Sequence, residues 1–78
     1  MYKTTDIVLA ACLRTQGYTL EDIEVVGNKG TFCFREVDDQ ILEDYDLGKC
    51  LVEPVAFNNT IKQLTTSVRR KTNTSRNF

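Results

Sequence analysis

The sequence predicts a small α+β domain in which a three-stranded sheet packs against a long C-terminal amphipathic helix. The chain has 78 residues, 41% of them hydrophobic, so it can build one modest core. Residues 19–37 contain two runs rich in β-branched and aromatic side chains around a glycine-containing turn, which is typical of a hairpin. Residues 54–71 carry apolar side chains at intervals of three and four, which indicates an amphipathic helix.

The first predicted element is a helix over residues 6–16. Thr4 or Thr5 can cap its N-terminus by accepting a backbone N–H, and the aspartate that follows is favoured by the helix dipole in the first turn. The apolar side chains of residues 7–13 cover more than one face, so we expect this helix to be well buried. Gly17 supplies the left-handed residue that ends it.

The next two elements form the predicted hairpin. Its turn is the sequence Gly27–Gly30, whose residues tolerate positive φ. In the second strand Phe32 and Phe34 point the same way, so both are assigned to the core. The residues Thr-Leu-Glu-Asp at 19–22 fit a capping box that would open a short helical turn instead of a strand, and the sequence leaves this alternative open.

A short second helix is predicted to follow the hairpin. Asp38 and Asp39 can cap or begin it, and Leu47 ends it before a glycine. Its apolar residues fall on one face; these are Ile41, Leu42 and Tyr45.

Residues 49–52 are predicted to form a short third strand, which Pro54 stops because proline lacks the backbone donor that a strand ladder needs. The element order is then α-β-β-α-β-α. A hairpin followed by a crossover helix suggests a mixed sheet with the helices chiefly on one face.

The last element is a helix over residues 54–71, with Pro54 in its first turn. Its apolar stripe consists of Phe57, Ile61, Leu64 and Val68. The three cations Arg69, Arg70 and Lys71 occupy its last turn, at the negative end of the helix dipole. Residues 1–71 thus form one compact domain, and the polar residues 72–78 are predicted to be a disordered tail.

The three cysteines are interpreted as buried small hydrophobic residues. Cys12, Cys33 and Cys50 are widely and irregularly spaced and include no C-x-x-C pair for zinc or thiol exchange. This favours a reducing compartment, and we expect a cytoplasmic protein. The longest apolar run, residues 7–13, is too short to span a membrane.

The composition argues against an enzyme. The chain has no histidine, which removes the commonest general base and the commonest metal ligand. A domain of this size has little room for a deep cleft beside its core. The Gly27–Gly30 turn has neither the spacing nor the following helix of a phosphate-binding loop. We therefore expect no catalytic residues, no metal and no cofactor.

Charge is strongly segregated along the chain. Residues 21–53 hold ten acidic and three basic residues, a net charge of −7, whereas residues 54–78 hold five basic residues and no acidic one. The candidates for protein binding lie in the acidic stretch and are Glu36, Asp38, Asp39, Glu43, Asp44, Asp46 and Tyr45. The candidates for nucleic-acid binding lie in the basic stretch and are Lys62, Arg69, Arg70, Lys71 and Arg76.

Aromatic side chains offer a second kind of contact. Phe32 and Phe34 on one strand could stack on bases only if that sheet face were open, and burial is the favoured interpretation. The aromatic residues predicted as exposed anchors are Tyr2, Tyr18, Tyr45 and Phe78.

Three stretches together resemble a family of small uncharacterised phage and bacterial proteins. They are residues 4–13 with Gly17, residues 30–34, and residues 52–57. In that family a T/S-D-x-x-L-A-A-x-L helix precedes a T-F-x-F strand and a V-(D/E)-P-x-x-F helix start. The resemblance covers residues 4–70 and implies a phage or mobile-element gene whose product acts by binding.

Two functional hypotheses follow. In the first, the protein modulates a host or defence complex, for example one of the CRISPR type, through its charged surfaces; the partner is a protein or a ribonucleoprotein. In the second, the basic C-terminal helix end binds nucleic acid directly. No membrane partner is expected. A homodimer is a further possibility, because the exposed edges of a three-stranded sheet can pair with another chain.

Overall fold

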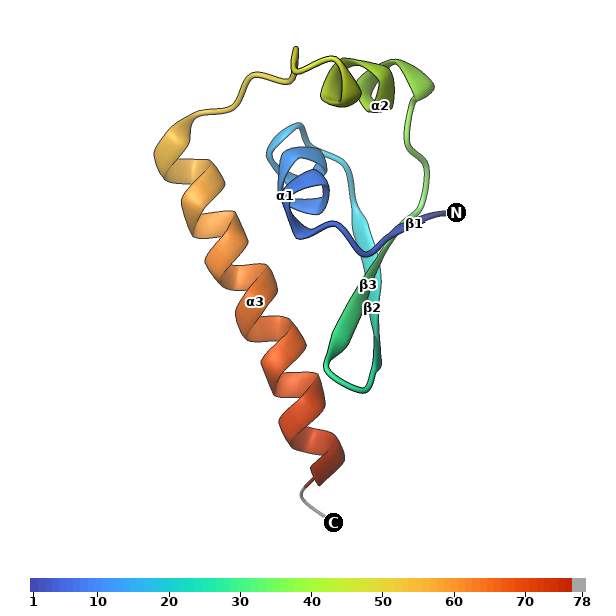
Figure 1. Cartoon of the computed structure of the whole chain (residues 1–78), viewed down its shortest axis with the longest axis vertical. Coiled ribbons are helices and arrows are strands. Elements are labelled where there is room, and N and C mark those ends of the chain that lie inside the picture. Colours follow the sequence, from blue (N-terminus) through green and yellow to red (C-terminus); the bar gives the residue numbers. More distant parts are fainter. Residues whose placement is uncertain (77–78) are drawn as a thin grey trace.

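The protein is an α+β domain, seen here in a computed structural model that describes the backbone of residues 1–76 and the side chains of residues 1–72. The elements are β1 (Tyr2–Thr4), α1 (Ile7–Thr15), β2 (Leu20–Val26), β3 (Lys29–Phe34), α2 (Asp39–Asp46) and α3 (Pro54–Arg76). The strands form one antiparallel sheet in the order β1-β3-β2. Figure 1 shows α1 and α3 on the same side of this sheet, with α2 above α1. The predicted fold class, with a three-stranded sheet against a long C-terminal helix, is confirmed.

The third strand comes from a different part of the chain than the sequence predicted. Residues 49–52 are not a strand; the third strand is β1, which pairs with β3 in the register Tyr2 to Phe34 and Thr4 to Phe32. The observed order is therefore β-α-β-β-α-α, and the sheet is antiparallel rather than mixed. The run after Gly48 lies outside the sheet, so its backbone has no strand to pair with, and Leu51 within it is 85% exposed.

The predicted hairpin is confirmed, and residues 19–22 do not form a helical turn. Gly27 and Asn28 make the two-residue connection between β2 and β3, since Val26 pairs with Lys29. Gly27 has a φ of 63°, whereas no non-glycine residue of the described chain has a positive φ. This is the pattern of a type II′ turn, whose twist suits a hairpin.

Helix α1 is capped by Asp6, not by Thr4 or Thr5. The Asp6 carboxylate accepts the backbone N–H groups of Val8 and Leu9, so its short side chain satisfies two donors of the first turn. Thr4 instead accepts the N–H of Asp6 through its hydroxyl. The helix ends as predicted at Gly17, where the N–H groups of Gly17 and Tyr18 donate to the carbonyl oxygens of Arg14 and Leu13.

Helix α3 begins as predicted and ends later. Glu53 caps it by accepting the N–H groups of Val55 and Ala56, and Pro54 is its first residue. The helix continues to Arg76 and so includes residues 72–76, which the sequence assigned to the tail. Residues 77–78 of that predicted tail lie outside the described residues. Residues 69–71 consequently lie within the helix rather than in its last turn.

The core lies between the sheet and the two helices α1 and α3. Phe32, Phe34 and Leu13 are among the largest fully buried side chains, and Leu64 of α3 is 4% exposed. The other predicted stripe residues of α3, Phe57, Ile61 and Val68, are half-buried against this core, as are the three apolar residues of α2. The burial of Phe32 and Phe34 confirms their core assignment.

The outer edge of β2 is covered by a side chain of α3. Lys71 lies seven residues after Leu64, so it continues the core-facing stripe of the helix. Its ammonium group donates to the Ile23 carbonyl oxygen and pairs with Asp22 at 3.0 Å. A charged group at a strand edge disfavours pairing with another strand, so Lys71 protects this side of the sheet.

Candidate functional site

The acidic candidates gather around α2, at one end of the molecule. Asp38 caps the helix by accepting the N–H of Gln40, which confirms the predicted helix start. Asp39, Glu43 and Asp46 recur at intervals of four and three and are exposed, so they share one solvent-facing side of α2. None of these four carboxylates forms a salt bridge within the part of the chain that the structure describes.

Two further acidic candidates lie apart from that face. The Asp44 side chain accepts a hydrogen bond from Gln40 at 2.9 Å, so part of its hydrogen-bonding capacity is used within α2. Glu36 precedes α2 and lines an open depression of about 700 Å³. The same depression is lined by Asp38 and by two half-buried tyrosines, Tyr2 and Tyr18. These tyrosines are thus at the surface but also pack against the core.

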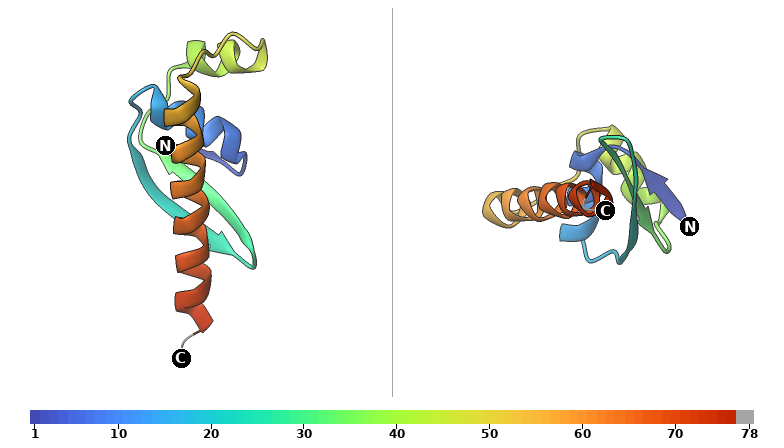
Figure 2. Two further views of the ribbon diagram at one scale, coloured as in Figure 1. Left: turned by 90° about the vertical axis from the view of Figure 1, so that its left-hand side faces the viewer. Right: turned by 90° about the horizontal axis from the view of Figure 1, so that it is seen from below.

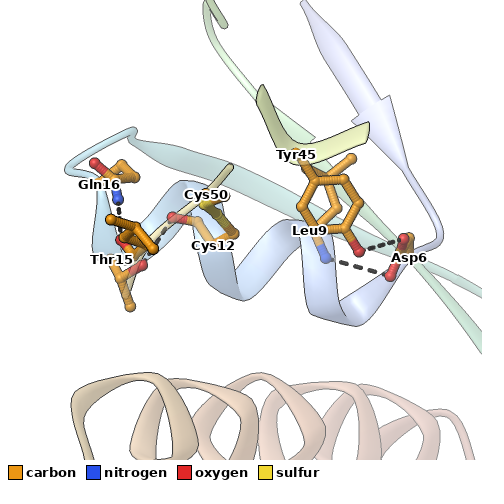
Figure 3. The surroundings of a disulfide bond; sticks show 8 residues. Asp6, Leu9, Cys12, Thr15, Gln16, Tyr45 and Cys50 are labelled. Carbon is orange, nitrogen blue, oxygen red and sulfur yellow. Dashed lines mark hydrogen bonds between the residues drawn. A yellow bond between two sulfur atoms is a disulfide. The ribbon is translucent and has the colours of Figure 1, made fainter. Parts of the chain in front are cut away.

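Tyr45 holds α2 against the start of α1. Its hydroxyl donates to the Asp6 carboxylate at 3.0 Å, and Figure 3 shows the ring lying over α1. Burial, with the neighbouring Asp6 carboxylate, raises the pKa of Tyr45 because both disfavour a phenolate. The main contact of Tyr45 is therefore within the molecule.

A disulfide joins the segment after α2 to α1, which corrects the interpretation of Cys12 and Cys50 as unpaired, buried small hydrophobic residues. Cys12 is bonded to Cys50, 38 residues away in the sequence. Beside it the Gln16 side chain donates to the Leu51 carbonyl oxygen at 3.0 Å (Figure 3). The remaining cysteine, Cys33, is free and 1% exposed, as predicted for a small hydrophobic residue. Paired cysteines remove the support that free thiols gave to a reducing compartment.

Apolar side chains are exposed next to the acidic helix. Leu47, Leu51 and Val55 are each at least 60% exposed, and all lie on or beside the connection from α2 to α3. A small hollow of about 170 Å³ lies nearby and is lined by Tyr45, Val52, Phe57 and both disulfide cysteines, among others. The acidic end of the molecule therefore combines accessible apolar surface with carboxylates that form no salt bridge among the described residues.

The basic candidates lie along α3. Lys62, Arg69 and Arg70 are exposed, whereas Lys71 is tied to β2 as described above. Arg76 lies in the helix, and its side chain is outside the described part of the chain. Figures 1 and 2 show the end of α3 at the opposite end of the molecule from α2. The structure thus separates the two predicted sets in space as the sequence separates them along the chain.

A second hollow contains a residue that the sequence analysis did not select. It has a volume of about 300 Å³ and lies between the hairpin turn, the start of α1 and the C-terminal half of α3. Its polar lining consists of Thr5, Asn28, Lys29, Thr65 and Arg69. The sequence analysis places Lys29 in the hairpin turn and among the three basic residues of the acidic stretch, not among the candidate site residues. The sequence offers no signal for its approach to Arg69, because the two are 40 positions apart.

The described residues were compared with the requirements of a metal site and of a membrane span. No group of three or more Cys, Asp or Glu side chains is placed to hold a metal ion within this part of the chain. Among the same residues, no helix is both long enough and apolar enough to cross a bilayer. Comparison with protein-family models, with curated proteins and with solved structures found no match to this chain.

Proposed function

We propose that the protein is a non-enzymatic binding protein that contacts a basic protein surface through the acidic face of α2. The observation that carries this proposal is the common, exposed side of α2 formed by Asp39, Glu43 and Asp46, none of which is neutralised within the described chain. Such a face attracts cationic partners and accelerates their association. The exposed Leu47 and Leu51 beside it supply apolar area for a stable contact.

The proposed partner is a host or defence complex, protein or ribonucleoprotein, for example one of the CRISPR type. The support for this setting is the sequence resemblance to small phage and bacterial proteins. We propose the host cytosol as the location. Disulfides in that compartment are usually transient, so a Cys12–Cys50 bond that persists in protein taken from cells would argue for another location.

The test is an affinity capture with matched charge variants. The tagged protein is used to capture partners from nuclease-treated lysate of bacteria that carry candidate defence complexes, beside the variants Glu43→Gln/Asp46→Asn and Glu21→Gln/Glu24→Gln. Both variants remove two negative charges, but the first changes α2, whereas the second changes β2 and also removes the carboxylate partners of Arg35 and Lys3. The side chains of Glu43 and Asp46 form no hydrogen bond within the described residues, so their removal should leave the fold intact.

The expected result is a discrete complex that is retained by the wild type and by the β2 variant and lost with the α2 variant. Its on-rate should fall as salt is raised, because long-range charge attraction is screened. Equal retention by both variants would contradict a role for the acidic face.

A second candidate function is direct nucleic-acid binding by α3. It is favoured by the exposed Lys62, Arg69 and Arg70 on a helix that has no acidic residue. Retention that disappears with nuclease treatment, together with binding of purified oligonucleotides, would favour this candidate over the first.

A further inference from the structure

Five polar residues line the hollow between the hairpin turn, α1 and α3, and their side chains have no polar partner among the described residues. They are Thr5, Asn28, Lys29, Thr65 and Arg69. Within the described residues, none of these side chains forms a hydrogen bond or a salt bridge. All five can donate hydrogen bonds, and two carry a positive charge. The hollow therefore presents an unused set of donors around one space.

Three other cations of the described chain have a carboxylate partner, which the two cations of the hollow lack. Lys3, Arg35 and Lys71 each pair with a carboxylate of β2, at distances from 2.7 to 3.0 Å. Lys29 and Arg69 line the hollow without a carboxylate among its other lining residues. Their positive charges are brought together from two elements, and nothing within the hollow compensates them.

The positions of these groups are fixed by the fold. Lys29 begins β3 directly after the type II′ turn, and the backbone of Gly30 next to it lies against Val68 of α3. Arg69 is the neighbour of Val68 on the same helix. The left view of Figure 2 and Figure 1 both show the hairpin alongside this half of α3. The contact that packs the hairpin onto the helix thus also places Lys29 and Arg69 at one hollow.

We propose that this hollow binds a phosphate group, either free or within a nucleic-acid backbone. A phosphate carries negative charge and several strong acceptor oxygens, which match two cations and three neutral donors. The site does not resemble a phosphate-binding loop, because its donors are side chains from three segments rather than backbone groups at a helix start. The proposal is independent of the acidic face of α2. It rests on the second candidate function only for the nucleic-acid case, to which it adds one more cation, Lys29, and two neutral donors, Thr5 and Asn28.

Inorganic phosphate is the first probe, because it tests the hollow without assuming a partner. Phosphate is titrated into ¹⁵N-labelled protein at constant ionic strength, with chloride as the reference anion, and amide shifts are followed. We expect saturable shifts at Thr5, Lys29 and Arg69. The variants Lys29→Gln and Arg69→Gln should each weaken phosphate binding about tenfold, because each removes a charge-assisted hydrogen bond. Lys62→Gln, on the same helix but outside the hollow, is the matched control and should leave binding unchanged.

Labelled single-stranded and duplex oligonucleotides identify the source of the phosphate. If it belongs to a nucleic-acid backbone, oligonucleotides bind and Lys29→Gln lowers the salt slope of log K by about 0.7 to 0.9. If oligonucleotides do not bind while phosphate does, the ligand is free phosphate or a small phosphorylated molecule, and the second candidate function fails while the hollow stands. Oligonucleotide binding that Lys29→Gln and Arg69→Gln leave unchanged places nucleic acid elsewhere on the protein.

The proposal is overturned if phosphate causes no saturable shift at the hollow, or if Lys62→Gln weakens phosphate binding as much as the two hollow variants do. The second result would show a general attraction of anions to α3. Circular dichroism and the thermal midpoint of each variant confirm that it is folded, which is expected because the three exchanged side chains form no hydrogen bond or salt bridge within the described residues.

Discussion

A Cβ atom on Gly30 would lie only 2.7 Å from the Cγ2 atom of Val68. The hairpin therefore approaches α3 so closely that a single methyl group does not fit between them. Val68 is β-branched and has little freedom to turn away. This contact, rather than a special backbone angle, is the reason for glycine at position 30, since only Gly17, Gly27 and Gly48 have positive φ in the described chain.

We predict that Gly30→Ala destabilises the protein by about 1 to 3 kcal/mol, the usual cost of overpacking a core contact. Chemical denaturation measures the change. Gly27→Ala is the control at the neighbouring turn, where an added Cβ meets nothing within 4 Å and the cost is backbone strain alone. Adding Val68→Ala to Gly30→Ala should recover part of the loss; a fully additive double mutant would show that the two sites do not interact.

Reduction of the disulfide should lower the free energy of unfolding substantially. The Cys12–Cys50 bond spans 38 residues, so the chain-entropy model gives a cost of about 4 kcal/mol for its loss. Denaturation with and without a dithiol reductant measures this, and Cys12→Ala/Cys50→Ala is the matched variant. That variant should be insensitive to the reductant. A wild type equally insensitive, with three alkylated thiols in the denatured protein, would show that the bond is not formed.

Cys33 should resist alkylation in the folded protein. Burial, with the neighbouring Glu24 carboxylate, raises the pKa of its thiol, so little of the reactive thiolate is present at neutral pH. The Lys3–Glu24 ion pair, at 2.7 Å, lies over it on the outer side of the sheet. We expect iodoacetamide to modify Cys33 only on unfolding. Labelling of the folded protein should be no faster after Lys3→Ala than after the distant Lys62→Ala, because the Lys3 ammonium lowers the pKa of the thiol and its removal takes that effect away. Rapid labelling of the native wild type would contradict the burial of this thiol.

The free energy of unfolding should decrease as the pH is lowered, because the Glu53 carboxylate that caps α3 becomes protonated. The N–H groups of Ala56 and Val55 hold the pKa of Glu53 below its usual value of 4.5. A carboxylate with a lowered pKa stabilises the folded state above its unfolded pKa, and this contribution is lost as pH falls below 4.5 through the folded value. Denaturation midpoints between neutral pH and acid should therefore decrease less for Glu53→Gln than for the wild type. Parallel curves would show that the ionised cap adds nothing.

The sequence predicted the elements whose pattern is long and periodic. Helices α1 and α2, the hairpin and the start of α3 are close to their predicted places, because period, caps and turn glycines agree there. Strand β1 was missed because Tyr2–Thr4 is too short to show a period, and it exists only through pairing with β3. Residues 49–52 have the apolar composition of a strand, but they pair with no strand of the sheet.

The sequence could predict a candidate site only where residues close together in the sequence form it. The acidic side of α2 follows from helical spacing, so the sequence could predict it. The disulfide could not be predicted, because three unpatterned cysteines allow several pairings and the pairing depends on how the segment after α2 lies against α1. The hollow could not be predicted either, because it depends on tertiary packing. Lys29 and Arg69 line one hollow because Gly30 allows the hairpin to pack closely against α3.

The central position of β3 also imposes an order on how the chain assembles during synthesis. Strands β2 and β3 are neighbours in sequence, so their hairpin closes through a short loop. Strand β1 is synthesised before the other two strands. Its residue Tyr2 pairs with Phe34 of β3, and β3 leaves the ribosome only after α1 and β2 have done so. Until then the earliest strand has no partner for its backbone groups. Strand β1 can therefore join the sheet only after β2 and β3 have formed. Its pairing with β3 closes the longest loop between paired strands and so has the largest loop-closure entropy cost in the sheet.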